Sequence, residues 1–316
     1  GGERSRVDEL HAQLLRYQEE AAKQLIPYTS KADITEFVRQ SREAISGKDF
    51  LTAILLFGFR PHLPVMTRLR EQAEENAEKY LFSRLFPKRY IGPSGKTIAI
   101  PGSMNSGDPE EREAAIRADM FELARLHFQF MAGADIWPMK TVLAHEHSLK
   151  LEEFSLFLER NVLIPPERAG MWAEGIRAGF IGDLPKAIHM LIPQLEHALR
   201  YLLERAGLLI SSIDKDGIQK ELNLNNLLYG EHGAKLNEMI GEDMVFGMQG
   251  LLVEKAGSDL RNRTAHGMVE EAEFYGAFAL CAWWMMIHFT LLPVRNSILS
   301  KESESEPTEG KENDNA

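Results

Sequence analysis

The sequence predicts an all-α fold that carries one small β-hairpin. Apolar residues recur at helical spacing along several long segments, of which 110–131 and 184–206 are the clearest. Aspartate or proline stands at the start of several of these segments, as is typical of helix N-termini. A strand-like stretch around a turn occurs near residues 88–100. These observations together predict helices along most of the chain and a single hairpin.

The N-terminal part is expected to be helical. We predict helices over residues 8–24, 33–46, 50–59 and 64–86. Asp33 would cap the second helix, and Glu36 at its third position would complete a capping box. The third helix ends before Pro61, because proline cannot continue a helix. The charged stretch 70–79 of the fourth helix is expected to face solvent.

The segment Tyr90–Thr97 ends in Gly-Lys-Thr, as a phosphate-binding P-loop does. A P-loop needs a glycine five residues before Gly95, and Tyr90 stands there instead. Residues 98–101 are strand-like, whereas a P-loop opens into a helix. We therefore expect a β-hairpin with a Gly-Pro-Ser-Gly turn and no nucleoside triphosphate site.

The next helix is expected over residues 110–131 and is strongly amphipathic. Trp137-Pro138 is expected to break the chain before a further helical stretch. His145-Glu146-His147 has the residue types of a metal site. However, side chains two positions apart point to different faces of a helix, and no third ligand follows at metal-binding spacing. We therefore expect a partly exposed histidine pair near a helix N-terminus, with no metal and no other cofactor.

Two helices follow the joint at Pro165-Pro166. The first is expected over residues 166–179. Asp183 would cap the second, 184–206, whose leucines and isoleucines keep the spacing of a helical bundle. Glu196 and Arg200 lie one turn apart on this helix, so their spacing predicts an i,i+4 ion pair.

The remaining helices are expected over residues 218–228, 242–256 and 270–292. Residues 274–294 hold no charge and are numerous enough to span a bilayer. The tail that follows is acidic, which does not favour a membrane anchor, so we expect a helix buried by its own bundle and a dimer partner. A transmembrane helix is the alternative. The acidic tail, 299–316, is expected to be disordered because it holds few apolar residues.

The stretch 257–267 is the densest polar cluster in the apolar C-terminal half. It reads Gly-Ser-Asp-Leu-Arg-Asn-Arg-Thr-Ala-His-Gly. Ser258 or Asp259 would cap a short helix there, and Gly267 would end it.

The side chains of this short helix suit a phosphodiester. Asn262 and His266 are i and i+4 and share a face, with Arg263 and Arg261 beside them. Arginine binds phosphate oxygens bidentately, and histidine takes or gives a proton near neutral pH, so this chemistry needs no metal. A solvated arginine pair with a capping histidine is the alternative interpretation.

The string Leu260–Gly267 resembles the L-R-N-x-x-A-H-G signature of a HEPN-like family of bacterial proteins. It also resembles the broader HEPN motif, in which an arginine and a polar residue precede a histidine. Residues 187–200, with the pattern Pro-Gln-x-Glu-x-x-x-Arg, are similar to the family's preceding helix. Gly241–Gly247 is similar to the start of the helix that leads into the motif. The resemblance covers roughly residues 145–295.

The resemblance implies a C-terminal HEPN-like bundle over residues 145–298, preceded by an N-terminal helical domain over 1–140. It also implies a homodimer and a metal-independent endoribonuclease, a class found in toxin, phage-defence (antiviral) and RNA-processing systems. Such an enzyme leaves 2′,3′-cyclic phosphate ends. Transfer RNA and a regulatory partner protein are compatible with this activity, but the sequence does not specify them.

The resemblance also implies a role for each polar residue. His266 would be the general acid or base, Arg261 would bind the scissile phosphate, and Asn262 would position one of them. The supporting residues would be Arg263, Asp259, Glu196 and Arg200. Some HEPN proteins have lost catalysis, so the alternative is a non-catalytic scaffold, or a nucleotide- or RNA-binding module that acts through dimerisation.

Composition limits the function further. The net charge of −11 argues against a broad basic surface that coats nucleic acid, while a small arginine-lined cleft stays compatible with it. Cys281 is the single cysteine, which excludes an intrachain disulfide and favours a reducing compartment. We therefore expect a cytoplasmic protein that is not held in a membrane.

Overall fold

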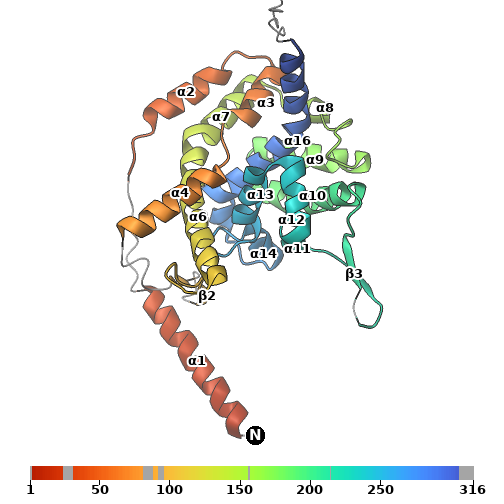
Figure 1. Ribbon diagram of the computed structural model, residues 1–316. Helices are drawn as coiled ribbons and strands as arrows, with labels where there is room; N and C mark the ends of the chain where they lie inside the picture. Colours follow the sequence, from red (N-terminus) through yellow and green to blue (C-terminus); the bar gives the residue numbers. More distant parts are fainter. Residues whose placement is uncertain are drawn as a thin grey trace, which may run out of the picture. The chain divides into compact units, whose positions relative to one another are not determined.

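The computed structural model describes residues 2–23, 31–80, 88–91, 96–155, 157–213 and 215–305 (Figure 1). Helices account for 70% of the chain and strands for 4%, which confirms the all-α class. The chain forms two compact units, each assembled from three segments. Within the described residues, unit 1 holds 2–44, 61–138 and 241–282, and unit 2 holds 45–60, 139–240 and 283–305. The two contiguous stretches expected from the sequence, 1–140 and 145–298, are thus interleaved in the structure.

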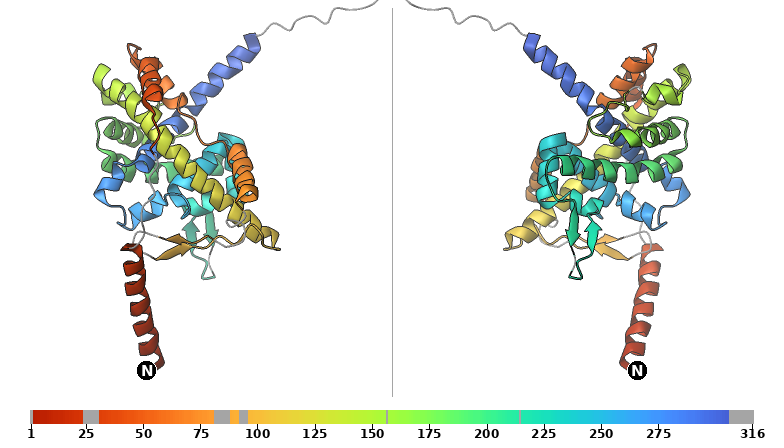
Figure 2. Two further views of the ribbon diagram at one scale, coloured as in Figure 1. Left: turned by 90° about the vertical axis from the view of Figure 1, so that its left-hand side faces the viewer. Right: turned by 90° about the vertical axis from the view of Figure 1, so that its right-hand side faces the viewer.

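Unit 1 is built around the long helix α6. Its elements are α1 (Gly2–Lys23), α2 (Thr35–Ile45), α4 (Met66–Lys79), β1 (Tyr90–Ile91), β2 (Thr97–Ala99), α6 (Pro109–Met131), η1 (Ala132–Ile136), α13 (Glu242–Met248), η3 (Gln249–Val253), α14 (Leu260–Ala265), α15 (Glu271–Phe274) and the first turn of α16 (Ala277–Ser305). Helix α4 packs against α6, and the two helices lie side by side in both Figure 1 and Figure 2. The rings of Phe121 and Phe246 stack at 4.6 Å between centroids, which joins α6 to α13.

Unit 2 is a second helical core. Its elements are α3 (Phe50–Phe59), α7 (Trp137–Glu146), α8 (Leu151–Ser155), η2 (Pro166–Arg168), α9 (Ala169–Phe180), α10 (Leu184–Arg205), β3 (Ser211–Ile213), β4 (Gln219–Glu221), α11 (Leu224–Leu227), α12 (Gly230–Ile240) and most of α16. Helices α9 and α10 pack closely, and the side chain of Leu191 fills the space that a Cβ at Gly175 would occupy. Fully buried rings of Phe57, Phe180 and Trp283 form the aromatic centre of this unit.

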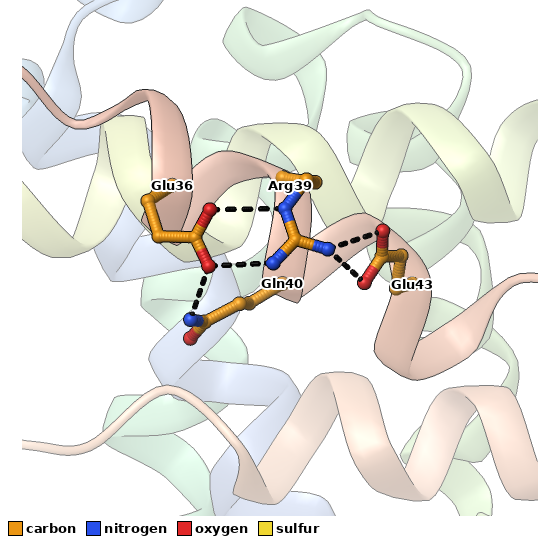
Figure 3. A network of polar contacts seen from close by, with 4 residues as sticks. All are labelled: Glu36, Arg39, Gln40 and Glu43. Atoms are coloured by element: carbon orange, nitrogen blue, oxygen red, sulfur yellow. Dashed lines mark hydrogen bonds and ion pairs between the residues drawn. The ribbon is translucent and has the colours of Figure 1, made fainter.

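Aspartate side chains start several helices. Asp183 accepts a hydrogen bond from the Lys186 amide at 3.1 Å, which confirms the expected cap of α10. Asp33 accepts from the Thr35 amide at 2.9 Å at the start of α2. The expected capping box is wrong, because the Glu36 carboxylate binds Arg39 and Gln40 further along the helix (Figure 3).

The strands form two antiparallel hairpins. Strands β1 and β2 confirm the first, and its Gly-Pro-Ser-Gly turn lies outside the described residues. The second pairs β3 with β4. The helix expected over 218–228 is therefore wrong at its start. Asn223 accepts from the Asn226 amide at 3.1 Å, so the helical turn α11 begins only after this cap.

The expected break at Trp137-Pro138 is also wrong. Helix α6 runs through the π-helical turn η1 directly into α7. The Trp137 amide donates to the Ala132 carbonyl, five residues back. This wide turn accommodates a proline that would otherwise clash with the preceding turn of an α-helix. The pair His145 and His147 consequently lies at the C-terminal end of α7, not near a helix N-terminus.

The last helical segment has a break that the pattern did not predict. Helix α15 ends at Phe274, and α16 begins at Ala277 and continues to Ser305. Residues 299–305 are therefore helical rather than disordered, and 306–316 lie outside the described residues. The segment Glu271–Ser297 is long and apolar enough to cross a membrane, yet 78% of its most apolar window is buried within the protein. A core helix passes the same test, so this observation is weak support for a membrane location.

Candidate functional site

A close backbone contact positions the polar motif in unit 1. The π-helical turn η3 ends at Val253, and the chain turns back so that the Ser258 amide donates to the Gly250 carbonyl at 2.9 Å. The Ser258 hydroxyl donates to the Leu251 carbonyl at 2.5 Å. A Cβ on Gly257 would lie 1.9 Å from the Gly250 carbonyl oxygen, so only glycine fits there. Ser258 thus anchors the turn and does not cap α14.

Asp259 fixes the start of α14. Its backbone is left-handed, with φ of 48°, which aspartate tolerates better than most residues. Its side chain makes no hydrogen bond to the helix backbone, so the expected cap is wrong. The carboxylate accepts instead from the Asn262 side-chain amide at 2.6 Å. Burial raises the pKa of Asp259, and the Asn262 hydrogen bond opposes that shift.

Asn262 links Asp259 to Arg261. Its side-chain oxygen accepts from Nη1 of Arg261 at 3.0 Å. The amide nitrogen is already committed to Asp259, so the orientation of the carboxamide is fixed. The chain Asp259–Asn262–Arg261 therefore holds one guanidinium, which is half-buried, at the surface of the turn.

Arg263 has a different partner. Its Nη2 contacts both carboxylate oxygens of Glu273, at 2.6 and 2.7 Å, and the Met268 carbonyl at 3.3 Å. Burial alone would raise the pKa of Glu273, but Arg263 and the Glu270 amide outweigh it, so the pKa lies below its usual range. Arg263 thus connects α14 to α15.

His266 follows the last residue of α14, and its side chain is exposed. Its imidazole makes no hydrogen bond to any residue that the structure describes. Its backbone amide donates to the Asn262 carbonyl at 3.1 Å, which places these two residues on one face, as expected. Gly267 then has a φ of 64°, and the Met268 amide donates to the Arg263 carbonyl at 2.8 Å. Together with the bond from the Gly267 amide to the Thr264 carbonyl at 3.2 Å, this is a Schellman motif, which confirms that Gly267 ends the helix.

Arg125 is a neighbour of the motif that the sequence analysis missed. This arginine of α6 donates to the Gly257 carbonyl, and its guanidinium lies 4.8 Å from the Phe278 ring centroid. Burial lowers the pKa of Arg125, and the positive charge of Arg263 acts in the same direction. The spacing could have indicated this contact. Arg125 and Phe128 follow Phe121 by four and seven residues, so Arg125 lies on the same stripe of the helix as the buried Phe121 and Phe128.

Glu196 and Arg200 belong to unit 2, whereas the motif belongs to unit 1. The two side chains pair with each other along α10, as their spacing predicted. Arg200 also donates from Nε to the Leu222 carbonyl at 2.8 Å. The role that the resemblance implies for this pair, orienting the motif, stays a prediction.

Among the described residues, no group of three or more histidine, cysteine, aspartate or glutamate side chains is arranged to hold a metal. This holds for His145 and His147 as well. A cavity of about 280 Å³ in unit 1 is lined by Asn76, Tyr80, Lys88, Asp119, Glu122, Leu123 and Leu126. None of these residues comes from the motif.

Comparison of the chain with protein-family models, curated protein sequences and solved structures finds no significant match. The motif and the geometry of its side chains are therefore the basis for the function proposed below.

Proposed function

We propose that the chain is a metal-independent endoribonuclease of HEPN type. The observation that carries the proposal is an exposed histidine at the end of the short helix that holds a fixed arginine. His266 is exposed and makes no hydrogen bond within the described residues, and it shares a face of α14 with Asn262, whose side chain holds Arg261. An imidazole that is open to solvent can transfer a proton and a fixed guanidinium can stabilise negative charge, and RNA cleavage by internal attack uses both.

The chemistry assigns a role to each group. His266 takes the proton from a ribose 2′-hydroxyl, whose oxygen attacks the adjacent phosphorus, or gives a proton to the departing 5′-oxygen. Arg261 binds the non-bridging phosphate oxygens and stabilises their added negative charge. The products are a 2′,3′-cyclic phosphate and a free 5′-hydroxyl. None of these steps requires a metal ion.

The contacts separate positioning residues from those that would touch RNA. Asn262, held by Asp259, orients the Arg261 guanidinium. Arg263 is engaged by Glu273, so it supports the turn and contributes positive charge nearby. The resemblance further implies that two copies act together as a homodimer. We further propose a cytoplasmic location, an RNA substrate such as tRNA, and a role as a toxin or in antiviral defence.

The alternative is a non-catalytic HEPN scaffold or an RNA- or nucleotide-binding module that acts through dimerisation. Two observations favour it. Both arginines of the turn have partners within the chain, and the net charge of −11 weakens attraction for RNA. A binding module would retain RNA without cleaving it.

The decisive experiment incubates the full chain with mixed tRNA and with unstructured RNA in excess EDTA. We expect cleavage with cyclic-phosphate ends, and a loss of about 10²- to 10⁴-fold in rate for His266→Ala. His145→Ala is the matched control, because His145 is also exposed but lies in unit 2. Equal rates for wild type and His266→Ala would refute the proposed role of His266. Retention of RNA by filter binding without cleavage would support the binding module.

A further inference from the structure

Helix α1 carries an apolar stripe at coiled-coil spacing. Val7, Leu10, Leu14 and Tyr17 follow one another at intervals of three, four and three residues. That spacing places them at the a and d positions of two consecutive heptads. Their exposed fractions are 64, 54, 52 and 66%, so the stripe faces solvent along the helix.

An apolar stripe that faces solvent along its whole length is unusual for a helix. None of the side chains of α1 that the structure describes is buried. A helix of 22 residues gains most of its stability in proteins from packing an apolar face. A stripe of two apolar residues per heptad, with only Leu15 added beside Leu14, is narrower than the face of a helix that packs on a globular core, and it resembles the seam of a coiled coil.

The charges beside the stripe identify the occupant. Arg6 and Glu20 both take the g position, two heptads apart, and both are exposed. In an antiparallel pair of identical helices, g positions face g positions, so Arg6 would lie opposite Glu20 of the partner subunit. In a parallel pair Arg6 would instead face the partner's His11, with no acidic group available. The charges therefore favour an antiparallel arrangement.

We propose that α1 pairs with α1 of a second copy as a short antiparallel coiled coil. Val7 then packs against the partner subunit's Tyr17, and Leu10 packs against Leu14 of the partner subunit. The two-fold axis repeats both contacts, and it repeats the pair between Arg6 and the partner's Glu20. The pairing depends on α1 alone, so it is independent of the proposed ribonuclease activity.

Cross-linking of the full chain tests the pairing and its direction. Gln13 is exposed and lies at a g position beside the two-fold axis, so it would face Gln13 of the partner subunit only in the antiparallel arrangement. Leu10 would face Leu10 of the partner subunit only in the parallel arrangement. Cys281, the native cysteine, is fully buried, so a short bismaleimide reacts with the introduced thiol. We expect Gln13→Cys to give a covalent dimer and Leu10→Cys to give little.

Substitutions along the seam complete the test. Leu14→Lys in the Gln13→Cys background should remove the covalent dimer, whereas Glu9→Lys, on the opposite face, should leave it. Arg6→Glu or Glu20→Arg alone should weaken the pairing about 2- to 30-fold in a dilution series, since each affects two symmetric pairs. The double variant Arg6→Glu/Glu20→Arg should restore it. The proposal is overturned if Gln13→Cys yields only monomer, if its dimer persists with Leu14→Lys, or if the double variant pairs no better than either single one.

Discussion

Replacement of Gly257 by alanine tests the close backbone contact that positions the motif. The added methyl group would lie 1.9 Å from the Gly250 carbonyl oxygen, 2.7 Å from its carbon and 3.0 Å from its Cα. All three are main-chain atoms, so no side-chain rotation can relieve the overlap. The turn must open, and the hydrogen bond from the Ser258 amide to Gly250 is the first contact affected.

The cost combines two effects. Overpacking a tight site destabilises a protein by about 1–3 kcal/mol. Stretching or losing the Ser258 hydrogen bond adds about 1–3 kcal/mol, because its groups are poorly placed to reach water. We expect a total of about 2–6 kcal/mol. For a chain of 316 residues that loss corresponds to a fall in melting temperature of about 3–9 °C.

The assay is thermal unfolding followed by far-ultraviolet circular dichroism. Gly107→Ala is the matched control, because it lies in the same unit with a negative φ and a Cβ there would meet nothing within 4 Å. We expect the control to melt within about 1 °C of the wild type, since a surface change of this kind has little effect. If Gly257→Ala also melts there, the close contact does not constrain the turn as we have argued.

Three further changes test other features. Glu273→Gln should cost about 1 kcal/mol or less of unfolding free energy at neutral pH. Because the folded-state pKa of Glu273 is lowered, the Arg263 contact stabilises the wild type above about pH 4.5 and is lost as pH falls further. Urea titrations at several pH values should therefore show that the unfolding free energy of the variant falls less steeply toward acid pH than that of the wild type. Gly179→Ala would place a Cβ 2.1 Å from Nε1 of Trp283, whose ring is fully buried. We expect the free energy of unfolding to fall by at least about 1–3 kcal/mol in a fluorescence-detected melt. An unchanged melt would contradict that packing. Burial raises the pKa of Cys281, so Ellman's reagent should react with the native thiol far more slowly than with the unfolded chain; equal rates would mean that the thiol is accessible.

Local signals explain why most helices could be predicted from the sequence. Asp183 and Gly267 each act through their own backbone neighbourhood, so the residue type alone fixes where a helix begins or ends. The same reasoning located the hairpin formed by β1 and β2. The helix expected over 218–228 failed because a competing local signal, the cap at Asn223, was overlooked.

Other features depend on contacts between distant segments. The wide turn η1 removes the clash at Pro138, and the adjacent residues carry no pattern that predicts this turn. At the candidate site, the sequence predicted the helical turn and the shared face of Asn262 and His266. It did not predict Arg125, which reaches Gly257 across 132 positions of the chain. Nor did it predict that Asp259 would hold a side chain instead of capping the backbone.

The π-helical turn η3 restricts how the length of this segment can vary. Its wider winding closes at the bond from the Glu254 amide to the Gln249 carbonyl, and the carbonyls of Gly250 and Leu251 receive both bonds from Ser258. Deleting one residue here would allow ordinary α-helical winding. It would also turn the following segment by about 100° around the helix axis, since each residue adds that rotation. Insertions and deletions tolerated in exposed loops should therefore be absent between Gln249 and Ser258 in functional variants, even where individual side chains change.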